Sequence, residues 1–363
     1  MADCLIIGGG LSGMLTAAEL VDAGATVTLL ERGEVGRESS WAGGGILSPL
    51  YPWRYDAAIN TLSRWSQRVY PEFTARLHSA TGIDPEWTCS GLWMLDGTEH
   101  SLALAWAEQQ GAVMAVVADA TIAEVVPELT QSTLWMAEIA QVRNPRLLAA
   151  LRRYLEIKGV VIKEQSEVVG LNIKSGRIDG VTTVNGVLAA EHVVVANGAW
   201  AAKLLAQLSI EIAVFPVRGQ MVLYQAPPGL LKNMVIYQGR YLIPRRDGHI
   251  LVGSTLEYVG FDKSTTVEAL SALKQAAERM VPALARYPIV RQWAGLRPGS
   301  ERGVPLIGPI PGINGLYINA GHFRYGVVMG PAAAHLLVDL ILQRAPLVDP
   351  APYAVVRSLF HPP

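Results

Sequence analysis

The first 31 residues constrain the fold more than any other part of the chain. An apolar run over residues 4–7 leads directly into a Gly-x-Gly-x-x-Gly spacing that starts at Gly8. The apolar pattern then predicts a helix over 11–23 and a second strand over 25–30, with Glu31 at its end. Strand, glycine turn, helix, strand and acid in this order predict a parallel βαβ unit that binds a dinucleotide.

Each residue type in this motif has a chemical reason. Gly8, Gly10 and Gly13 allow the backbone to approach a pyrophosphate, which the unpaired N–H groups at the start of the helix would bind. Glu31 would accept hydrogen bonds from the hydroxyls of the adenosine ribose. The alternative is a glycine-rich turn in an ordinary α/β protein, which would explain the glycines but not the order of the elements around them.

The motif does not distinguish FAD from NAD, but the residues that follow it favour FAD. A nicotinamide dehydrogenase would continue with regular βα repeats, whereas residues 38–46 form a loop rich in glycine and serine. A flavin cofactor needs protein contacts along its whole length, so distant segments should return to it. We expect two such segments, the strand that ends at Asn197 and Gly198 and the loop over 321–330. The helix after that loop would direct its positive end at the flavin.

Composition excludes several other classes of protein. Lys and Arg total 30 against 31 Asp and Glu, so no basic surplus points to nucleic acid or to an anionic membrane. Cys4 and Cys89 lie far apart in the sequence, which argues against a disulfide framework and a cysteine-based zinc site. No apolar run reaches the ~18 residues that cross a bilayer, and the first residues lack a basic secretory signal. We therefore expect a cytoplasmic protein without a membrane span.

Hydrophobic periodicity predicts the remaining elements. The helices are expected over 60–81, 101–111, 145–159, 267–280 and 331–344. Asn144 is the expected N-cap of the helix over 145–159, and Pro331 stands near the start of the last helix. Turns at Gly176 and at Asn185 predict a small antiparallel meander, and Asp247 with the following glycine predicts a hairpin.

Four stretches together carry a resemblance to a known family. They are residues 6–13, 39–45, 293–299 and 319–326, and two shorter matches lie at 215–219 and 241–245. In this combination the chain resembles the D-amino-acid oxidase family of FAD enzymes, and most closely the bacterial glycine oxidases of thiamine biosynthesis. The similarity runs in order along nearly the whole chain.

The resemblance implies an α/β fold with a Rossmann-like FAD-binding domain interleaved with an antiparallel-sheet α+β substrate domain. The FAD-binding domain would comprise residues 1–48, 142–213 and 296–363, and the substrate domain residues 49–141 and 214–295. The implied reaction is oxidative deamination of glycine and other small amino acids or amines, such as sarcosine and small D-amino acids. The imine would become a keto acid plus ammonia or amine, and O2 would be reduced to H2O2.

The resemblance also implies the substrate-binding residues. Arg297 would bind the substrate carboxylate, Tyr241 would assist through its hydroxyl, and Arg324 would lie beside the pocket and the flavin. The planar fork of arginine suits a carboxylate better than lysine does. A hydride can pass from a neutral amine to the cofactor without a dedicated base, so no residue is assigned as a catalytic acid or base, and no metal is expected.

The motifs and the resemblance together assign fourteen residues to FAD: Gly8, Gly10, Gly13, Glu31, Arg32, Ser39, Ser40, Gly44, Val168, Gly198, Gly321, His322, Arg324 and Gly326. The FAD is expected to be non-covalent, because no cysteine follows Cys89 to form the thioether of related sarcosine oxidases. Ile46 and Leu256 stand where the glycine oxidases carry methionines, and the loop before Tyr241 is one residue shorter. These departures leave the substrate range open.

Alternatives to these assignments stay open at the level of sequence. Arg297 could be a surface or ion-paired arginine, Arg324 and Tyr241 could be structural, and His322 could merely position its loop. A D-amino-acid dehydrogenase of the same fold would pass electrons to a quinone. A non-enzymatic FAD protein or RNA-modification partner would need a basic patch that the charge balance does not provide. The expected partners are a small amino acid and O2, and homo-oligomer formation is left open.

Overall fold

The βαβ unit predicted for the first residues is present. β1 (Asp3–Ile7) leads through the glycine turn into α1 (Leu11–Asp22), and β2 (Thr26–Leu30) pairs with β1 in parallel. The computed structural model describes residues 3–96, 99–117, 126–127 and 133–355 of the chain.

β1 belongs to a six-stranded sheet with the order β18-β19-β12-β1-β2-β8. Neighbouring strands of this sheet are parallel, except that β18 is antiparallel to β19. The remaining strands are β8 (Val161–Lys163), β12 (His192–Val195), β18 (Leu306–Pro309) and β19 (Leu316–Ala320). Ile6 is buried with residues of α1, α3 (Ala57–Thr81), α6 (Asn144–Ile157) and α9 (Gly326–Ile341), whereas Leu5 is buried with residues of α7 (Ala201–Leu205). Both faces of the sheet are therefore covered, as expected for parallel strands.

A second, eight-stranded sheet has the order β17-β13-β16-β15-β14-β4-β6-β5 and is antiparallel except between β14 and β4. One face is buried under α8 (Val267–Met280), and the other carries Tyr241 and Met221. Its strands are β4 (Leu92–Met94), β5 (Ala115–Val117), β6 (Thr133–Met136), β13 (Val214–Gln225), β14 (Met234–Tyr237), β15 (Arg240–Pro244), β16 (His249–Gly253) and β17 (Ile289–Ser300). The predicted hairpin at Asp247 joins β15 to β16.

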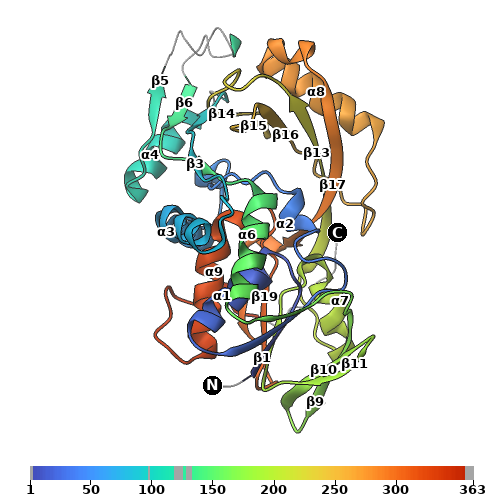
Figure 1. Cartoon of the computed structure of the whole chain (residues 1–363). Helices are drawn as coiled ribbons and strands as arrows, with labels where there is room; N and C mark the ends of the chain where they lie inside the picture. Colours follow the sequence, from blue (N-terminus) through green and yellow to red (C-terminus); the bar gives the residue numbers. More distant parts are fainter. Residues whose placement is uncertain (1–2, 97–98, 118–125, 128–132, 356–363) are drawn as a thin grey trace.

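Smaller elements complete the described chain. The predicted meander is a three-stranded antiparallel sheet of β9 (Val168–Lys174), β10 (Arg177–Thr183) and β11 (Gly186–Ala189). The others are α2 (Ser39–Ala42), α4 (His100–Gln110), the pair β3 (Thr88–Cys89) and β7 (Ala140–Gln141), and 3-10 turns at Pro52–Arg54, Gly198–Trp200, Ala206–Leu208, Pro282–Arg286, Glu301–Gly303 and Ala351–Tyr353. The two large sheets lie at opposite ends of the molecule (Figure 1).

The predicted fold class is confirmed: a parallel, helix-covered sheet is interleaved along the chain with an antiparallel one. The residue ranges of the two domains stay a prediction. α3 lies within the range expected for the substrate domain, yet its Ile59 and Leu62 are buried in the same cluster as α1 and α9. The long strands β13 and β17 pair along nearly their whole length, with Val214 opposite Ser300 at one end. They connect the region of the parallel sheet to the second sheet.

Two details of the sequence prediction are wrong. The last helix begins at Gly326, so Pro331 lies inside it rather than near its start. The proline removes one backbone N–H, and α3 supplies replacement contacts: Tyr70 donates to the Val327 carbonyl at 2.5 Å, and the Ala332 N–H donates to Ser66 Oγ at 3.0 Å. A partner helix distant in sequence thus makes an internal proline tolerable.

Asn144 is not the N-cap of α6. Arg143 flanks the helix, and Asn144 is its first residue. The Asn144 side chain instead donates from Nδ2 to the Ser40 carbonyl at 2.7 Å. A tertiary contact has therefore taken the side chain that local propensity assigned to the helix start.

His335 on α9 gives stability a pH dependence. Its Nδ1 lies 2.9 Å from Glu19 Oε2, and this hydrogen bond raises the pKa of His335 above its ordinary 6.5. Asp339 also favours the protonated form, whereas burial and Arg344 oppose it. A raised histidine pKa contributes stability that is full below the unfolded-state pKa and is lost as pH rises through the folded-state pKa. We expect His335→Gln to lower the melting temperature more at pH 6 than at pH 8, measured with equal FAD loading. Equal losses at both pH values would contradict this.

Candidate functional site

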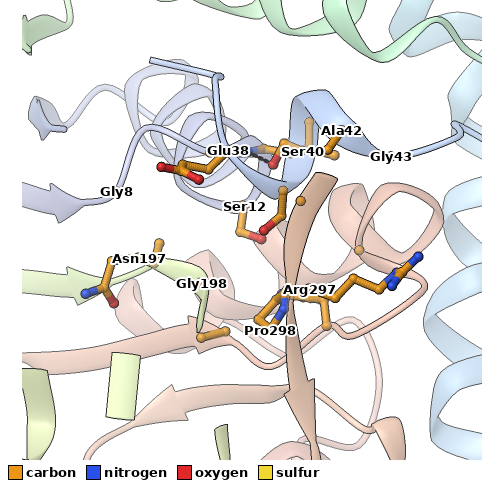
Figure 2. Close-up of a pocket in the computed structure, with 18 of the residues that line it drawn as sticks. Gly8, Ser12, Glu38, Ser40, Ala42, Gly43, Asn197, Gly198, Arg297 and Pro298 are labelled. Carbon is orange, nitrogen blue, oxygen red and sulfur yellow. Dashed lines mark hydrogen bonds between the residues drawn. The ribbon is translucent and has the colours of Figure 1, made fainter. Parts of the chain in front are cut away.

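A cavity of about 450 Å³ runs from the carboxyl ends of β1, β2 and β12 to the face of the second sheet. Its lining includes the glycine turn and Asn197 at one end and Arg297 at the other, as the close-up shows (Figure 2). Ligands bind at this edge of open parallel sheets because the strand order reverses there. Most of the predicted cofactor residues and all the predicted substrate residues therefore meet in one cavity.

The glycine turn is built by close backbone approaches. Gly8 has φ +112°, and a Cβ there would lie 2.6 Å from the Ala196 carbonyl oxygen of the neighbouring segment. A Cβ on Gly13 would lie 1.9 Å from the carbonyl oxygen of Gly8. Gly8 and Gly10 line the cavity, whereas Gly13 lies behind it and lets α1 pack against the turn. A larger residue at either contact would move the turn or the helix.

Glu31 fixes the same turn from the end of β2. It is 9% exposed and lines the cavity, and its carboxylate accepts N–H groups from Gly9 at 2.8 Å and Gly33 at 3.0 Å. Its remaining lone pairs can accept further hydrogen bonds. Arg32 also lines the cavity, stacked 3.6 Å from the ring centroid of Trp200 and paired with Glu38.

The loop over residues 38–46 forms one wall. Ser40 Oγ accepts the Leu11 N–H at 2.9 Å, so it contacts the first turn of α1, and the Ser39 hydroxyl donates to the Leu296 carbonyl on β17. Gly44 approaches the second sheet closely, since a Cβ there would lie 2.8 Å from Ile243 and 3.2 Å from Tyr241. This loop therefore joins the glycine turn to the substrate end.

The remaining predicted cofactor residues come from three segments. Val168, Gly198, His322, Arg324 and Gly326 line the cavity, and Gly321 does not. His322 is 2% exposed, and burial lowers its pKa to about 4, so its ring is neutral. Its Nε2 contacts Asn319 Oδ1 at 2.7 Å.

Arg297 lies at the substrate end with neutral partners. Its Nη2 donates to Ser254 Oγ at 2.7 Å and its Nη1 to the Thr255 carbonyl at 3.2 Å. No described carboxylate forms an ion pair with it, and burial lowers its pKa below the ordinary arginine value. The guanidinium lies against Gly219, where a Cβ would be only 2.1 Å from Nη1. Each of the two nitrogens, Nη1 and Nη2, carries a second N–H group that can bind an anion.

The two other predicted substrate residues line the same end. Tyr241 is 8% exposed, and its hydroxyl lies 3.6 Å from the sulfur of Met221, a weak acceptor that a carboxylate could replace. Arg324 lines the cavity and makes no hydrogen bond or ion pair with the described part of the chain.

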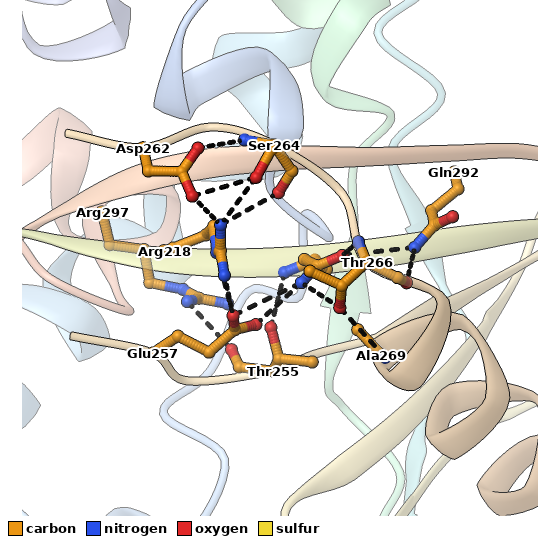
Figure 3. Close-up of polar contacts among 10 residues, drawn as sticks. Arg218, Thr255, Glu257, Asp262, Ser264, Thr266, Ala269, Gln292 and Arg297 are labelled. Carbon is orange, nitrogen blue, oxygen red and sulfur yellow. Dashed lines mark hydrogen bonds and ion pairs between the residues drawn. The ribbon is translucent and has the colours of Figure 1, made fainter. Parts of the chain in front are cut away.

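The acceptors of Arg297 are held from the opposite face of β13. Arg218 donates to Glu257 Oε2 at 2.5 and 2.9 Å and to Asp262 Oδ2 at 2.5 Å, and its backbone pairs with that of Glu257 (Figure 3). Thr255, whose carbonyl faces Arg297, lies two residues before Glu257. This network around the buried Arg218 therefore fixes the segment on which Arg297 rests.

Comparison with known proteins matches this arrangement. The family model described as FAD dependent oxidoreductase, DAO, matches residues 3–340. The chain belongs to this FAD-dependent oxidoreductase family. The resemblance stated from the motifs is thereby confirmed, as is FAD as the cofactor.

Individual relatives of the family are similar over most of their length. Glycine oxidase of Pseudomonas putida is 47% identical over 354 residues, covering 96% of this chain and 97% of that one. Glycine oxidase of Pseudomonas aeruginosa is 48% identical, covering 98% and 99%. The bifunctional protein ThiO/ThiG of Trichormus variabilis is 34% identical over 94% of this chain and 53% of its own length. The crystal structure of glycine oxidase from Geobacillus kaustophilus has a TM-score of 0.91 at 28% identity, covering 99% and 100%.

The residues of this family member fit FAD. The cavity presents the N-terminus of α1, the Glu31 carboxylate and closely approaching glycine backbone, which suit a pyrophosphate and a ribose. Asn197 Oδ1 and His322 Nδ1 are buried without a partner in the described part of the chain, as expected where a ligand supplies one. In the described residues, no helix is long and apolar enough to cross a membrane.

Gly219 and Met221 were not assigned a role from the sequence, although the stretch 215–219 carried part of the family resemblance. A strand glycine beside a functional arginine is the signal that could have drawn attention to Gly219, but only the fold shows that Arg297 lies across it.

We expect Gly219→Ala to push the Arg297 guanidinium out of place. The end of a long side chain can move, so the fold and the FAD content should be kept. A misplacement of about 1 Å can cost about 100-fold in kcat/KM, and we expect most of this loss as a raised KM for glycine. Gly170→Ala on β9, where a Cβ makes an ordinary 3.6 Å contact, is the matched control. Normal KM in Gly219→Ala would show that the guanidinium is not held by this contact.

Proposed function

We propose that this flavoprotein oxidises glycine and other small amino acids or amines, including sarcosine and small D-amino acids. The amine loses two electrons and two protons to become an imine. Water then converts the imine to a keto acid plus ammonia or amine, and O2 takes the electrons and protons to give H2O2. The observation that supports this most is Arg297, a guanidinium without a carboxylate partner, at one end of the FAD cavity.

The proposal gives each substrate residue a defined action. Arg297 binds the carboxylate through its fork, and the Tyr241 hydroxyl turns from Met221 to donate to the same carboxylate. This would orient the Cα–H bond of the amino acid toward the cofactor. Bound FAD supplies the acceptor for the hydride.

Three relatives support the assignment. The Pseudomonas proteins are named glycine oxidase, and the Trichormus protein joins a related sequence to a second part in a bifunctional protein named ThiO/ThiG. We infer that the imine product feeds thiazole formation in thiamine biosynthesis, in the cytoplasm. The non-covalent attachment of FAD belongs to the same proposal.

A substrate panel read by peroxide release tests the proposal. Under air, glycine, sarcosine, D-alanine and D-proline should each yield one H2O2 per imine formed. A protein that reduces a quinone or a dye but releases no peroxide would instead be the D-amino-acid dehydrogenase of the same fold. Acid precipitation should release yellow FAD into the supernatant, and colour kept in the pellet would contradict non-covalent binding.

A further inference from the structure

Behind the glycine wall of the cavity lies an arginine that the proposed reaction does not use. Arg245 follows β15 directly and is partly buried. Its Nη1 donates to Gln141 Oε1 at 2.7 Å and to the Val142 carbonyl at 3.0 Å, and its Nη2 donates to the Gly44 carbonyl at 2.7 Å. All three acceptors are neutral, and no described carboxylate forms an ion pair with Arg245.

Arg245 keeps its charge in this setting. Burial, and then the nearby charge of Arg143, lower its pKa to about 10, which still leaves it protonated at neutral pH. The nearby carboxylates of Glu86 and Asp247 favour the charged form, but neither forms an ion pair with Arg245, so its field also acts on the neutral groups that it contacts. The group directly in front of it is the peptide between Gly44 and Gly45.

The orientation of that peptide follows from its hydrogen bond. The Gly44 carbonyl points at Arg245, and in a trans peptide the following N–H points the opposite way. The Gly45 N–H therefore faces away from Arg245. No acceptor in the described part of the chain takes this N–H. Gly44 and Gly45 line the cavity and Arg245 does not, so the N–H lies on the cavity side.

The peptide is also held against rotation. The Val142 N–H donates to the Gly45 carbonyl at 2.9 Å, while the Val142 carbonyl accepts from Arg245. Gly45 has φ +81°, and a Cβ there would lie 2.1 Å from the Val142 carbonyl oxygen, so only glycine fits. Arg245 and Val142 thus fix two successive carbonyls of the wall.

The position along the cavity identifies what this N–H meets. Gly44 lies beside Tyr241, at the substrate end. The reactive ring of FAD must come to this end, because hydride transfer requires contact between ring and amino acid. We propose that Arg245 is a positioning residue that turns the Gly45 N–H toward the flavin ring and polarises it as a hydrogen-bond donor. The ring gains negative charge on reduction, so this donor stabilises the reduced form more than the oxidised form.

The test is the redox equilibrium of the holoenzyme. Each protein is mixed with a dye of known potential, and the ratio of oxidised to reduced flavin is measured. Arg245→Met should shift that ratio at least tenfold toward the oxidised form, about 30 mV for a two-electron couple, and should weaken FAD binding. The matched control is Arg246→Met, the next residue, which is exposed and contacts Asp84, Trp87 and Thr88. It should leave the ratio unchanged.

Two further variants keep the proposal testable if Arg245→Met fails to fold. Arg245→Lys retains the charge without the fork, and Arg245→Gln retains a donor without the charge. The lysine variant should stay closer to the original protein in its redox ratio than the glutamine variant. A normal ratio in Arg245→Met, or equal ratios in the lysine and glutamine variants, would overturn the proposal and leave Arg245 as a purely structural residue. The substrate panel does not enter this measurement, so its outcome is independent.

Discussion

Replacing Arg297 by alanine is expected to lower kcat/KM for glycine by roughly 30-fold to several-thousand-fold. Truncating one partner of a buried, hydrogen-bonded charge pair costs ~2–5 kcal/mol, and ~1.4 kcal/mol corresponds to tenfold in rate. Arg297→Lys should keep more of kcat/KM than the alanine variant but less than the original protein, because a point charge does not restore the fork. Tyr241→Phe should cost about 1 kcal/mol, since it removes one neutral hydroxyl. Steady-state kinetics with each variant check these values.

FAD content separates lost binding from lost folding, and it should be nearly normal in all three variants. The decisive control is an amine that lacks a carboxylate. If Arg297→Ala impairs oxidation of that amine as strongly as that of glycine, the arginine does not bind the carboxylate. In that case Gly219→Ala would lose its expected effect as well, because the two act through the same guanidinium.

Replacing Glu31 by lysine is expected to weaken FAD binding about 100-fold or more. The change removes the acceptor of the Gly9 and Gly33 N–H groups and the proposed acceptor of the ribose. Hydrogen bonds to a charged acceptor contribute about 1.5–3 kcal/mol each, and a cation beside the positive end of α1 adds repulsion. The measurement is titration of apoprotein with FAD by flavin fluorescence.

Glu34→Lys supplies the same charge reversal nearby. Glu34 is exposed and pairs with Arg37 at 2.9 Å, so FAD affinity should be nearly unchanged. Glu31→Gln keeps the shape and should have a smaller effect than the lysine variant. Equal FAD affinity in Glu31→Lys and Glu34→Lys would show that Glu31 does not serve the cofactor.

The sequence predicted best what is local in the chain. The βαβ unit, the helix over 267–280, the meander and the hairpin at Asp247 depend on periodicity and turn residues within short windows. The ends of helices were predicted less accurately, because tertiary contacts determine where a helix begins. α9 extends back to Gly326 because Tyr70 and Ser66 of α3 compensate for its proline, and no local pattern contains that information.

In the candidate site, too, residues in local motifs were predicted well and residues that depend on tertiary contacts were not. Twelve of the fourteen residues assigned to FAD line the cavity, since motif and order along the chain carry most of the signal. Gly13 and Gly321 lie behind it. Their spacing is equally regular, but distinguishing a lining glycine from a packing glycine requires the neighbours of each. Arg245 had no assigned role because its three acceptors come from segments about 100 and 200 residues away.

The interleaving of the parallel sheet has a consequence for biosynthesis. β1 emerges first, but its neighbour β12 ends at Val195, and β19, the next strand along, spans Leu316–Ala320. At roughly 5–20 residues per second, about 15–60 s pass between the glycine turn and the strand and loop that face it across the cavity. A nascent chain therefore carries an unfinished nucleotide site that must avoid aggregation for most of translation. The absorbance of protein-bound flavin in a cell extract therefore reports only chains whose translation has passed α9.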